Sequence, residues 1–191
     1  MIKTGVYVGS FDPIHKGHIN LAQQLLTKKV VDQIVMIATG NYWQKTLGAS
    51  INDRLAMLDF YQSDKIIIDH VNNDQQYTYQ ILDRLKVQHP DWELALIIGD
   101  DLFSEFDHWQ RLDRLLTNQI IVINRFDLDV DEHLKKFKQK QQFTIINDLA
   151  KFDASSTRIR QLIKNDINDI TLTDYLDVKV LQYIIDHHLY Q

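Results

Sequence analysis

Short runs of β-branched and other apolar residues recur along the chain, separated by longer stretches in which apolar positions lie three or four residues apart. The runs show little alternation with polar residues, which is typical of strands that are covered on both faces. We therefore predict six strands, at residues 6–8, 34–38, 66–68, 94–98, 120–123 and 143–146.

Apolar residues at helical spacing predict helices between these runs. One helix follows His18, and Ser50 with Asp53 has the capping-box-like pattern of a helix start. The apolar positions that mark the predicted helices are Ile19, Ala22, Leu25 and Leu26; Leu55, Leu58 and Tyr61; Ile81, Leu82 and Leu85, before Pro90; and Leu134 and Phe137. Since strands and helices alternate, we expect an α/β fold, a Rossmann-like parallel sheet with helices on both faces.

The last forty residues show helical spacing and no further strand. Helices are predicted over residues 155–164 and 175–187, and no internal repeat, low-complexity tract or flexible Gly/Ser linker precedes them. We therefore expect a single domain over residues 1–191. Within it, residues 1–150 form the Rossmann-like core and residues 151–191 form a small C-terminal helical subdomain.

Composition narrows the class of protein. The 191 residues carry a net charge of −5 and 45% hydrophobic residues, which argues against global disorder and against a broad basic surface for nucleic acid. The absence of cysteine excludes disulfides, thiolate metal sites and cysteine nucleophiles. No apolar run approaches the ~20 residues that span a bilayer, and the N-terminus lacks a signal-peptide pattern. We expect a soluble, cytoplasmic protein that binds neither nucleic acid nor membrane; composition leaves its oligomeric state open.

The scarce glycines and prolines gather in one place. The chain has 6 Gly and 2 Pro, and Gly9, Pro13 and Gly17 fall between the first predicted strand and the first helix. Such a turn lies at the carboxyl edge of a parallel sheet, where ligands bind, and a helix N-terminus favours phosphate. His15 and His18 can point to one side and donate to phosphate oxygens. A metal pair is the alternative for these histidines, but the sequence assigns no third ligand, and we expect no protein-held metal.

A second stretch, DASSTRIR at residues 153–160, has the pattern of a helix start, with hydroxyl groups at the cap and arginines in the first turn. Cations at this position oppose the helix dipole. An anion bound at the helix end would account for them. An ordinary serine cap with solvated arginines is the alternative.

Both stretches resemble signatures of the HxGH nucleotidyltransferases, specifically the bacterial nicotinate-nucleotide adenylyltransferases. The first is similar to G-[ST]-F-D-P-x-H-x-G-H, with Val8 where the family usually has another glycine, and the second to I-S-x-T-x-x-R, with Ala154 in place of isoleucine. Further similarities are Gln76-Tyr77-Thr78 to S-Y-T, Ile97-Ile98-Gly99-Asp100-Asp101 to I-I-G-x-D, Phe106 and Trp109 to F-x-x-W, and Tyr175 to Tyr190 to the family's C-terminal end. The resemblance covers essentially the whole chain.

The resemblance implies an adenylyltransferase that moves AMP from ATP to nicotinate mononucleotide, giving deamido-NAD and pyrophosphate in NAD biosynthesis. It implies that Mg²⁺ arrives with ATP, and that the nucleophile is the phosphate of the mononucleotide. By the same resemblance the catalytic residues are His15, His18, Lys45 and Arg160; the ATP-binding residues are Gly9, Ser10, Phe11, Gly17, Gly99, Asp101, Ser155 and Thr157; and the mononucleotide-binding residues are Tyr77, Thr78 and Trp109.

One loop departs from the family pattern. Where the family usually has P-P-H-[KR], this chain has Asn41 to Lys45, which keeps only the cation. The preference between nicotinate and nicotinamide therefore stays open. The alternatives are the same chemistry on nicotinamide mononucleotide or phosphopantetheine, or a catalytically inactive nucleotide-binding regulator. The sequence assigns no role to Arg54, Arg125 or the pair His187 and His188.

Overall fold

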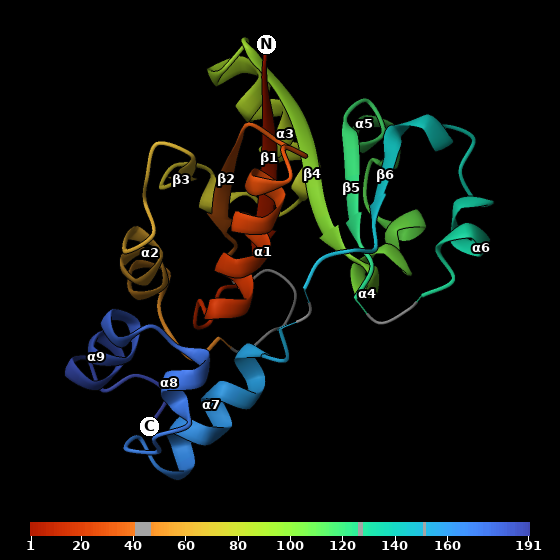
Figure 1. Ribbon diagram of the computed structural model, residues 1–191. Helices are drawn as coiled ribbons and strands as arrows, with labels where there is room; N and C mark the ends of the chain where they lie inside the picture. Colours follow the sequence, from red (N-terminus) through yellow and green to blue (C-terminus); the bar gives the residue numbers. More distant parts are fainter. Residues whose placement is uncertain (41–46, 126–127, 151) are drawn as a thin grey trace.

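One six-stranded parallel sheet forms the centre of the molecule (Figure 1). The computed structural model describes residues 1–40, 47–125, 128–150 and 152–191. The strands are β1 (Ile2–Gly9), β2 (Gln33–Ala38), β3 (Ile66–Ile68), β4 (Trp92–Gly99), β5 (Gln119–Ile123) and β6 (Phe143–Ile146). Their order is β3–β2–β1–β4–β5–β6, so β1 and β4 are neighbours although two strands separate them in sequence. The strand order reverses here, and such a switch point leaves a crevice for ligands at the carboxyl edge.

The expected strands are all present, and two of them, β3 and β6, have the predicted bounds. The others are longer than predicted because neighbouring strands supply backbone partners to residues outside the apolar runs. In β1, for example, Ile2 and Lys3 pair with Trp92 and Glu93 of β4. The expected α/β fold with a Rossmann-like sheet is confirmed.

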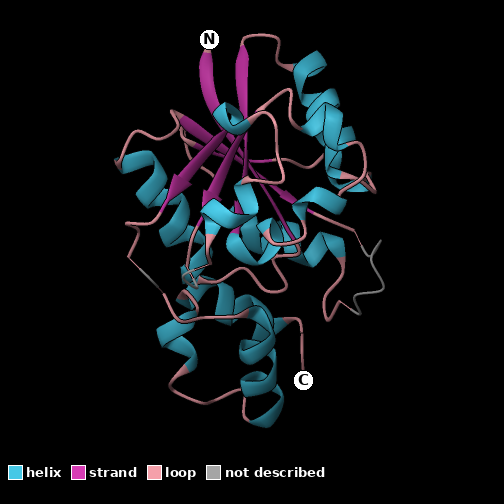
Figure 2. Ribbon diagram, turned by 90° about the vertical axis from the view of Figure 1, so that its right-hand side faces the viewer, coloured by secondary structure: helices cyan, strands magenta, loops and turns pink. Residues whose placement is uncertain are grey.

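Helices cover both faces of the sheet (Figure 2). The α-helices are α1 (Lys16–Thr27), α2 (Ile51–Asp59), α3 (Thr78–Gln88), α4 (Asp100–Phe103), α5 (Leu112–Leu115), α6 (Val130–Leu134), α7 (Ser156–Asn165), α8 (Leu172–Tyr175) and α9 (Val178–Asp186), with short 3₁₀ turns at Asn72–Asp74, Phe106–His108 and Lys140–Gln142. One apolar cluster joins a face of the sheet to α1, α2 and α7–α9, and a second joins the other face to α3, Phe103, Phe106 and Phe137.

The C-terminal helices lie beyond the carboxyl edge of the sheet, at the end toward which the strand arrows point (Figures 1 and 2). Ile159, Leu176 and Ile184 are buried in the same apolar cluster as Phe11 and Ile14 of the β1–α1 turn. This apolar cluster is thus shared by the C-terminal helices and the β1–α1 turn. The single domain over residues 1–191 and its division near residue 150 stay predictions.

The predicted helix over residues 175–187 is wrong in its first part. The structure has two helices there, α8 and α9, because the chain is extended at Leu176 and Asp177. Leu176 is buried in this conformation, and Asp177 accepts a hydrogen bond of 2.5 Å from the hydroxyl of Tyr61. Tyr61 and Phe137 likewise lie just after the helices to which the spacing assigned them. In these places tertiary contacts decide the backbone conformation.

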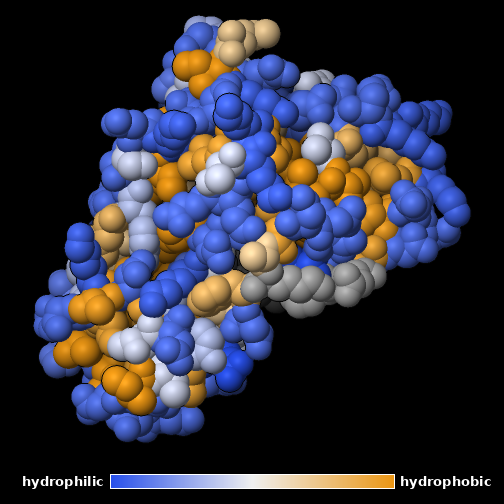
Figure 3. Space-filling model, in the orientation of Figure 1, coloured by the Kyte–Doolittle hydropathy of each residue, from blue (hydrophilic) through white to orange (hydrophobic). Residues whose placement is uncertain are grey.

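The surface in the view of Figure 3 is mainly hydrophilic, with apolar groups over the C-terminal helices at the lower left and near β5 and β6 at the upper right. Within the described ranges, no helix combines the length and the apolar character needed to cross a membrane.

Candidate active site

The β1–α1 turn brings the two motif histidines into contact. His15 is the N-cap residue of α1, with an extended backbone, and its N–H donates to Nδ1 of His18 at 3.3 Å. The two imidazole rings stack with centroids 3.6 Å apart. Gly17 permits this arrangement, because a Cβ at that position would lie 2.9 Å from Nδ1 of His15. The turn therefore presents both rings as one unit at the helix N-terminus.

Both histidines are neutral at pH 7. Burial, with a smaller contribution from the nearby Arg125 charge, lowers the pKa of His15 from 6.5 to about 4. Burial also holds the pKa of His18 well below 6.5, assisted by His15 and Arg125. Because Nδ1 of His18 accepts the N–H of His15, its proton resides on Nε2. His18 is thus an uncharged N–H donor.

Phe11 lies behind the histidines. It is buried, and its ring meets His18 edge-on with centroids 5.1 Å apart and Tyr7 edge-on at 5.4 Å. Phe11 was assigned to ATP binding from the sequence. Its place in the structure makes it a packing support for the His18 ring, within the apolar cluster that also holds the C-terminal helices.

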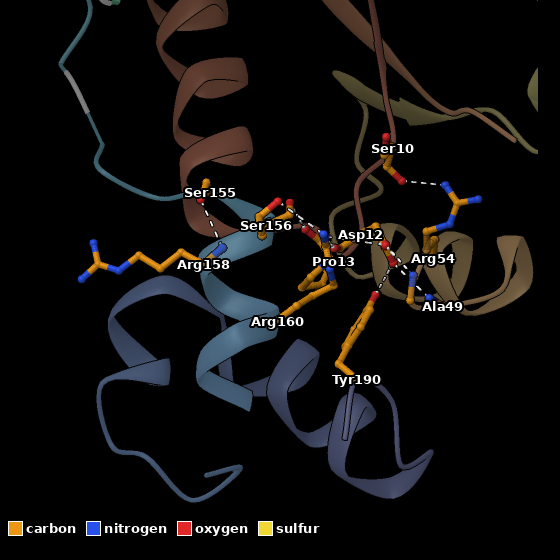
Figure 4. A network of polar contacts seen from close by, with 12 residues as sticks. Ser10, Asp12, Pro13, Ala49, Arg54, Ser155, Ser156, Arg158, Arg160 and Tyr190 are labelled. Carbon is orange, nitrogen blue, oxygen red and sulfur yellow. Dashed lines mark hydrogen bonds and ion pairs between the residues drawn. The ribbon is translucent and has the colours of Figure 1, made fainter. Parts of the chain in front are cut away.

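The carboxylate of Asp12 is the centre of a polar network beneath the same turn (Figure 4). The residue is 1% exposed. Its carboxylate accepts hydrogen bonds from the N–H groups of Gly48 at 2.8 Å and Ala49 at 3.1 Å, and from the hydroxyl of Tyr190 at 2.8 Å. These donors come from the segment before α2 and from the end of the chain, so one buried charge links three distant parts of the sequence.

Arg54 forms hydrogen bonds both to the β1–α1 turn and to the end of the neighbouring strand β2. It is 1% exposed, and its Nη1 donates to the carbonyl oxygens of Ser10 at 2.6 Å and Thr39 at 2.8 Å. Burial lowers its pKa, while Asp12 acts in the opposite direction. The sequence assigned no role to Arg54. Its contacts fix the backbone where β1 and β2 both end.

Helix α7 brings the second motif to the first. Ser155 is its N-cap and accepts from the N–H of Arg158, while Ser156 donates to the carbonyl oxygen of Pro13 at 3.0 Å (Figure 4). Arg160 donates to the carbonyl oxygen of Asp12 at 2.6 Å and to the hydroxyl of Thr157 at 3.3 Å. The two motifs, about 140 residues apart in sequence, therefore share direct hydrogen bonds.

On the α1 side of the sheet, the histidines border a small hollow of about 30 Å³. Arg125, just after β5, lines it together with Gly17 and residues of the segment before α7. The Arg125 guanidinium lies 3.3 Å from the carboxylate of Asp101, and its backbone N–H donates to the buried carboxylate of Asp100 at 2.9 Å. Gly99 precedes these acidic residues at the end of β4. The predicted ATP residues Gly17, Gly99 and Asp101 thus lie around this side of the turn.

On the α3 side, a larger cavity of about 460 Å³ opens over the ends of β1 and β4. Gly9 and Ser10 form part of its wall, as do Tyr77 and Thr78 at the start of α3. Trp109, at the end of the 3₁₀ turn Phe106–His108, lines it from another direction and packs on Phe106. All three predicted mononucleotide residues therefore border one cavity.

Apart from Phe11, Gly99 and Asp101, the predicted residues that the structure describes fall into three groups by position. Gly9, Ser10, Tyr77, Thr78 and Trp109 share the larger cavity; His15, Gly17 and His18 share the small hollow; and Ser155, Thr157 and Arg160 lie at the start of α7. Lys45 and the rest of the departing loop lie outside the described residues. Within the described ranges, no group of three or more His, Cys, Asp or Glu side chains is arranged to hold a metal ion.

Sequence reasoning missed the contacts of Asp12, Tyr190 and Arg125. Asp12 lies inside the first motif, and an acidic residue among apolar and glycine neighbours is a signal for a buried, fully hydrogen-bonded carboxylate. Tyr190 ends the stretch that resembles the family's C-terminal end, but no local pattern predicts its partner or that of Arg125, since these partners are 178 and 24 residues away.

Comparisons with known proteins identify the family and the fold. Residues 6–162 match the family model of cytidylyltransferase-like proteins. A probable nicotinate-nucleotide adenylyltransferase of Clostridium novyi is 31% identical over 177 residues, covering 86% of this chain and 88% of that protein. The corresponding Borreliella burgdorferi protein is 29% identical over 197 residues, covering 99% and 97%. The structure of Plasmodium falciparum nicotinic acid mononucleotide adenylyltransferase complexed with NaAD has the same fold, with a TM-score of 0.83, 24% identity and coverage of 100% and 98%.

The lowered pKa of His15 predicts a pH dependence of stability. The unfolded chain protonates this imidazole near pH 6.5, whereas the folded chain keeps it neutral down to about pH 4. The fold therefore loses stability as pH falls through that window, by roughly 2 kcal/mol between pH 6.5 and 5. In urea unfolding at pH 7 and pH 5, we expect the free energy of unfolding of His15→Asn to fall less than that of the unmodified chain. Equal losses in the two proteins would contradict the assignment of a neutral, buried His15.

Proposed function

The chain belongs to the cytidylyltransferase-like family and, within it, to the nicotinate-nucleotide adenylyltransferases, and from this premise we propose that it transfers the adenylyl group of ATP to nicotinate mononucleotide. The products are deamido-NAD and pyrophosphate. The observation that carries the proposal is a pair of compartments that both take lining residues from the β1–α1 turn. One is bordered by stacked histidines and Arg125, and the other by aromatic residues and the start of α3.

The larger cavity suits the mononucleotide. Trp109 and Tyr77 offer aromatic surface on which a pyridine ring can stack. Thr78 begins α3, an 11-residue helix whose first N–H groups favour a negatively charged group such as a carboxylate. Gly9 and Ser10 line this cavity and begin the turn that carries the histidines, so we place the phosphate of the mononucleotide at this end of β1.

The reaction needs no nucleophilic side chain. A phosphate monoester has a second pKa of about 6, so the phosphate of the mononucleotide is largely dianionic at pH 7. One of its oxygens attacks the α-phosphorus of ATP, and the bond from that phosphorus to the bridging oxygen breaks. The electron pair leaves with pyrophosphate, and no proton has to move. Catalysis then depends on alignment and on donors placed where negative charge develops.

His15 and His18 supply such donors. As neutral imidazoles they can donate N–H groups to the α- and β-phosphate oxygens without carrying a positive charge in their buried position. The stacked pair is held by the N-cap hydrogen bond and by Phe11, so little reorganisation accompanies the reaction. This preorganisation is the physical basis of the role that we propose for them.

The start of α7 is the proposed site of the β- and γ-phosphates. Ser155 and Thr157 offer hydroxyl groups, and Arg160 offers a guanidinium that remains partly exposed. We also assign Lys45 to this group, on its place in the sequence. On the opposite side, Gly99 and Asp101 are proposed to contact the adenosine.

Mg²⁺ enters this proposal as part of the substrate MgATP. The described donors around the turn are imidazole, guanidinium, hydroxyl and backbone N–H groups, which suit phosphate oxygens and do not suit Mg²⁺. The carboxylate of Asp101 on the α1 side is paired with Arg125. The one buried carboxylate at the turn, Asp12, is already engaged by three hydrogen-bond donors. The phosphates and water would therefore hold the ion.

Replacing His18 tests the catalytic assignment. His18→Ala removes one preorganised donor, and we expect the rate of pyrophosphate release with nicotinate mononucleotide to fall by about 10²-fold or more. The circular dichroism spectrum should stay that of the folded protein. His70→Ala is the matched control, because His70 is an exposed histidine that pairs with Asp59 outside the site. Turnover of His18→Ala equal to that of the control would refute the assignment.

Replacing Trp109 tests the division between the two compartments. Trp109→Ala removes aromatic surface from the larger cavity only, so we expect KM for the mononucleotide to rise by about tenfold while KM for ATP changes little. The control is Trp92→Ala, since Trp92 begins β4 at the opposite end of that strand and stacks on His89. An unchanged KM for the mononucleotide in Trp109→Ala would remove this residue from the site.

A further inference from the structure

We propose that Tyr190 is a positioning residue for adenylyl transfer: by donating its hydroxyl to Asp12, it keeps the side chain of Arg160 available to the phosphates of ATP. This inference rests on the role proposed above for Arg160. It assigns to the end of the chain a function that neither motif contains.

The buried carboxylate of Asp12 requires hydrogen-bond donors. A carboxylate removed from water needs hydrogen-bond donors on both oxygens, because an unsatisfied buried charge is strongly unfavourable. The N–H of Gly48 donates to Oδ2, while the N–H of Ala49 and the hydroxyl of Tyr190 both donate to Oδ1. Tyr190 is the one side chain among these donors, and it donates at 2.8 Å.

The guanidinium of Arg160 lies next to the same carboxylate. Its Nη1 lies 3.7 Å from Oδ2 of Asp12, beyond hydrogen-bond distance, while it donates to the backbone carbonyl of that residue at 2.6 Å. The guanidinium thus lies beside Asp12 without a direct hydrogen bond to its carboxylate. In Figure 4, Tyr190 reaches Asp12 from below, and the side chain of Arg160 extends from α7 to the backbone of Asp12.

The structure holds Tyr190 firmly in this position. Its φ is 64°, in the left-handed region that residues with a Cβ rarely adopt, although it is the second-last residue of the chain. Its ring lies against Gly48 so closely that a Cβ there would be 2.6 Å from a ring carbon. Burial, with Asp12 next to it, raises the pKa of Tyr190 above its ordinary value of 10, so the hydroxyl stays protonated and remains a donor.

Loss of the hydroxyl has a specific consequence. Without it, the N–H of Ala49 is the one donor left to Oδ1 of Asp12 among the residues that the structure describes, and the carboxylate becomes a stronger competitor for Arg160. A guanidinium and a carboxylate form a charge-assisted pair readily at this distance. When the side chain of Arg160 pairs with the carboxylate of Asp12, it no longer contacts the triphosphate. We therefore expect weaker binding of ATP and unchanged binding of the mononucleotide.

A double-mutant cycle tests this coupling. We would measure Kd for MgATP without acceptor, by titration calorimetry, for the unmodified chain, Tyr190→Phe, Arg160→Ala and the double variant. Tyr190→Phe keeps the ring against Gly48, and we expect it to weaken ATP binding by about tenfold and to leave Kd for nicotinate mononucleotide unchanged. In the Arg160→Ala background, Tyr190→Phe should cause no further loss, because the residue on which it acts is gone.

The matched control is Tyr183→Phe. Tyr183 also belongs to the C-terminal segment and also donates to an aspartate, Asp53 at 3.1 Å, but it does not contact Asp12. We expect this variant to bind ATP as the unmodified chain does. If Tyr190→Phe does not fold, a chain ending at residue 189 lacks the same donor and should show the same loss, specific to ATP.

The outcomes separate this inference from the function on which it rests. Normal ATP binding by Arg160→Ala would overturn the role of Arg160 and, with it, that of Tyr190. If Arg160→Ala weakens ATP binding but Tyr190→Phe does not, or if the two losses multiply in the double variant, the positioning role of Tyr190 alone is refuted. A loss that extends equally to the mononucleotide would also refute it, because that pattern indicates general damage to the fold.

Discussion

The arrangement around the site depends on one buried negative charge. The carboxylate of Asp12, 1% exposed, lies within the β1–α1 turn and takes its donors from the segment before α2 and from the end of the chain. A charge in such surroundings is tolerated only when fixed donors surround it, so these segments must meet in one geometry. The apolar cluster that joins α7–α9 to Phe11 and Ile14 supplies the packing that brings them there.

A second consequence of this geometry is that two compartments share one turn. Strands β1 and β4 are neighbours at the point where the strand order reverses. The larger cavity is lined by residues of both strands, and the smaller hollow is lined by Tyr7 of β1 and Ile123 of β5. Reaction between two nucleotides requires that their phosphates meet while their rings are held apart. The turn from Gly9 to His18 contributes Gly9 and Ser10 to the larger cavity and His15, Gly17 and His18 to the hollow. In the proposed mechanism its neutral histidines donate hydrogen bonds without exchanging protons.

Much of this architecture could be predicted from local sequence. Apolar runs such as Ile66–Ile68 mark strands because both faces of the sheet are buried, and Ser50 caps α2 because its hydroxyl meets the N–H of Asp53. The turn with its glycines and histidines also indicated a phosphate site. Features that depend on contacts between residues far apart in the sequence could not be predicted. The extended backbone at Leu176 depends on burial against other helices, and the partner of Tyr190 lies 178 residues away. No periodicity or motif contains that information.

The central claim is that this chain joins ATP to nicotinate mononucleotide, and the most direct test compares acceptors. Pyrophosphate release from MgATP would be measured side by side with nicotinate mononucleotide, nicotinamide mononucleotide and phosphopantetheine. The account predicts the highest kcat/KM with nicotinate mononucleotide and no release above background with phosphopantetheine. Binding of ATP without pyrophosphate release for any acceptor, or a higher kcat/KM with another acceptor, would contradict it.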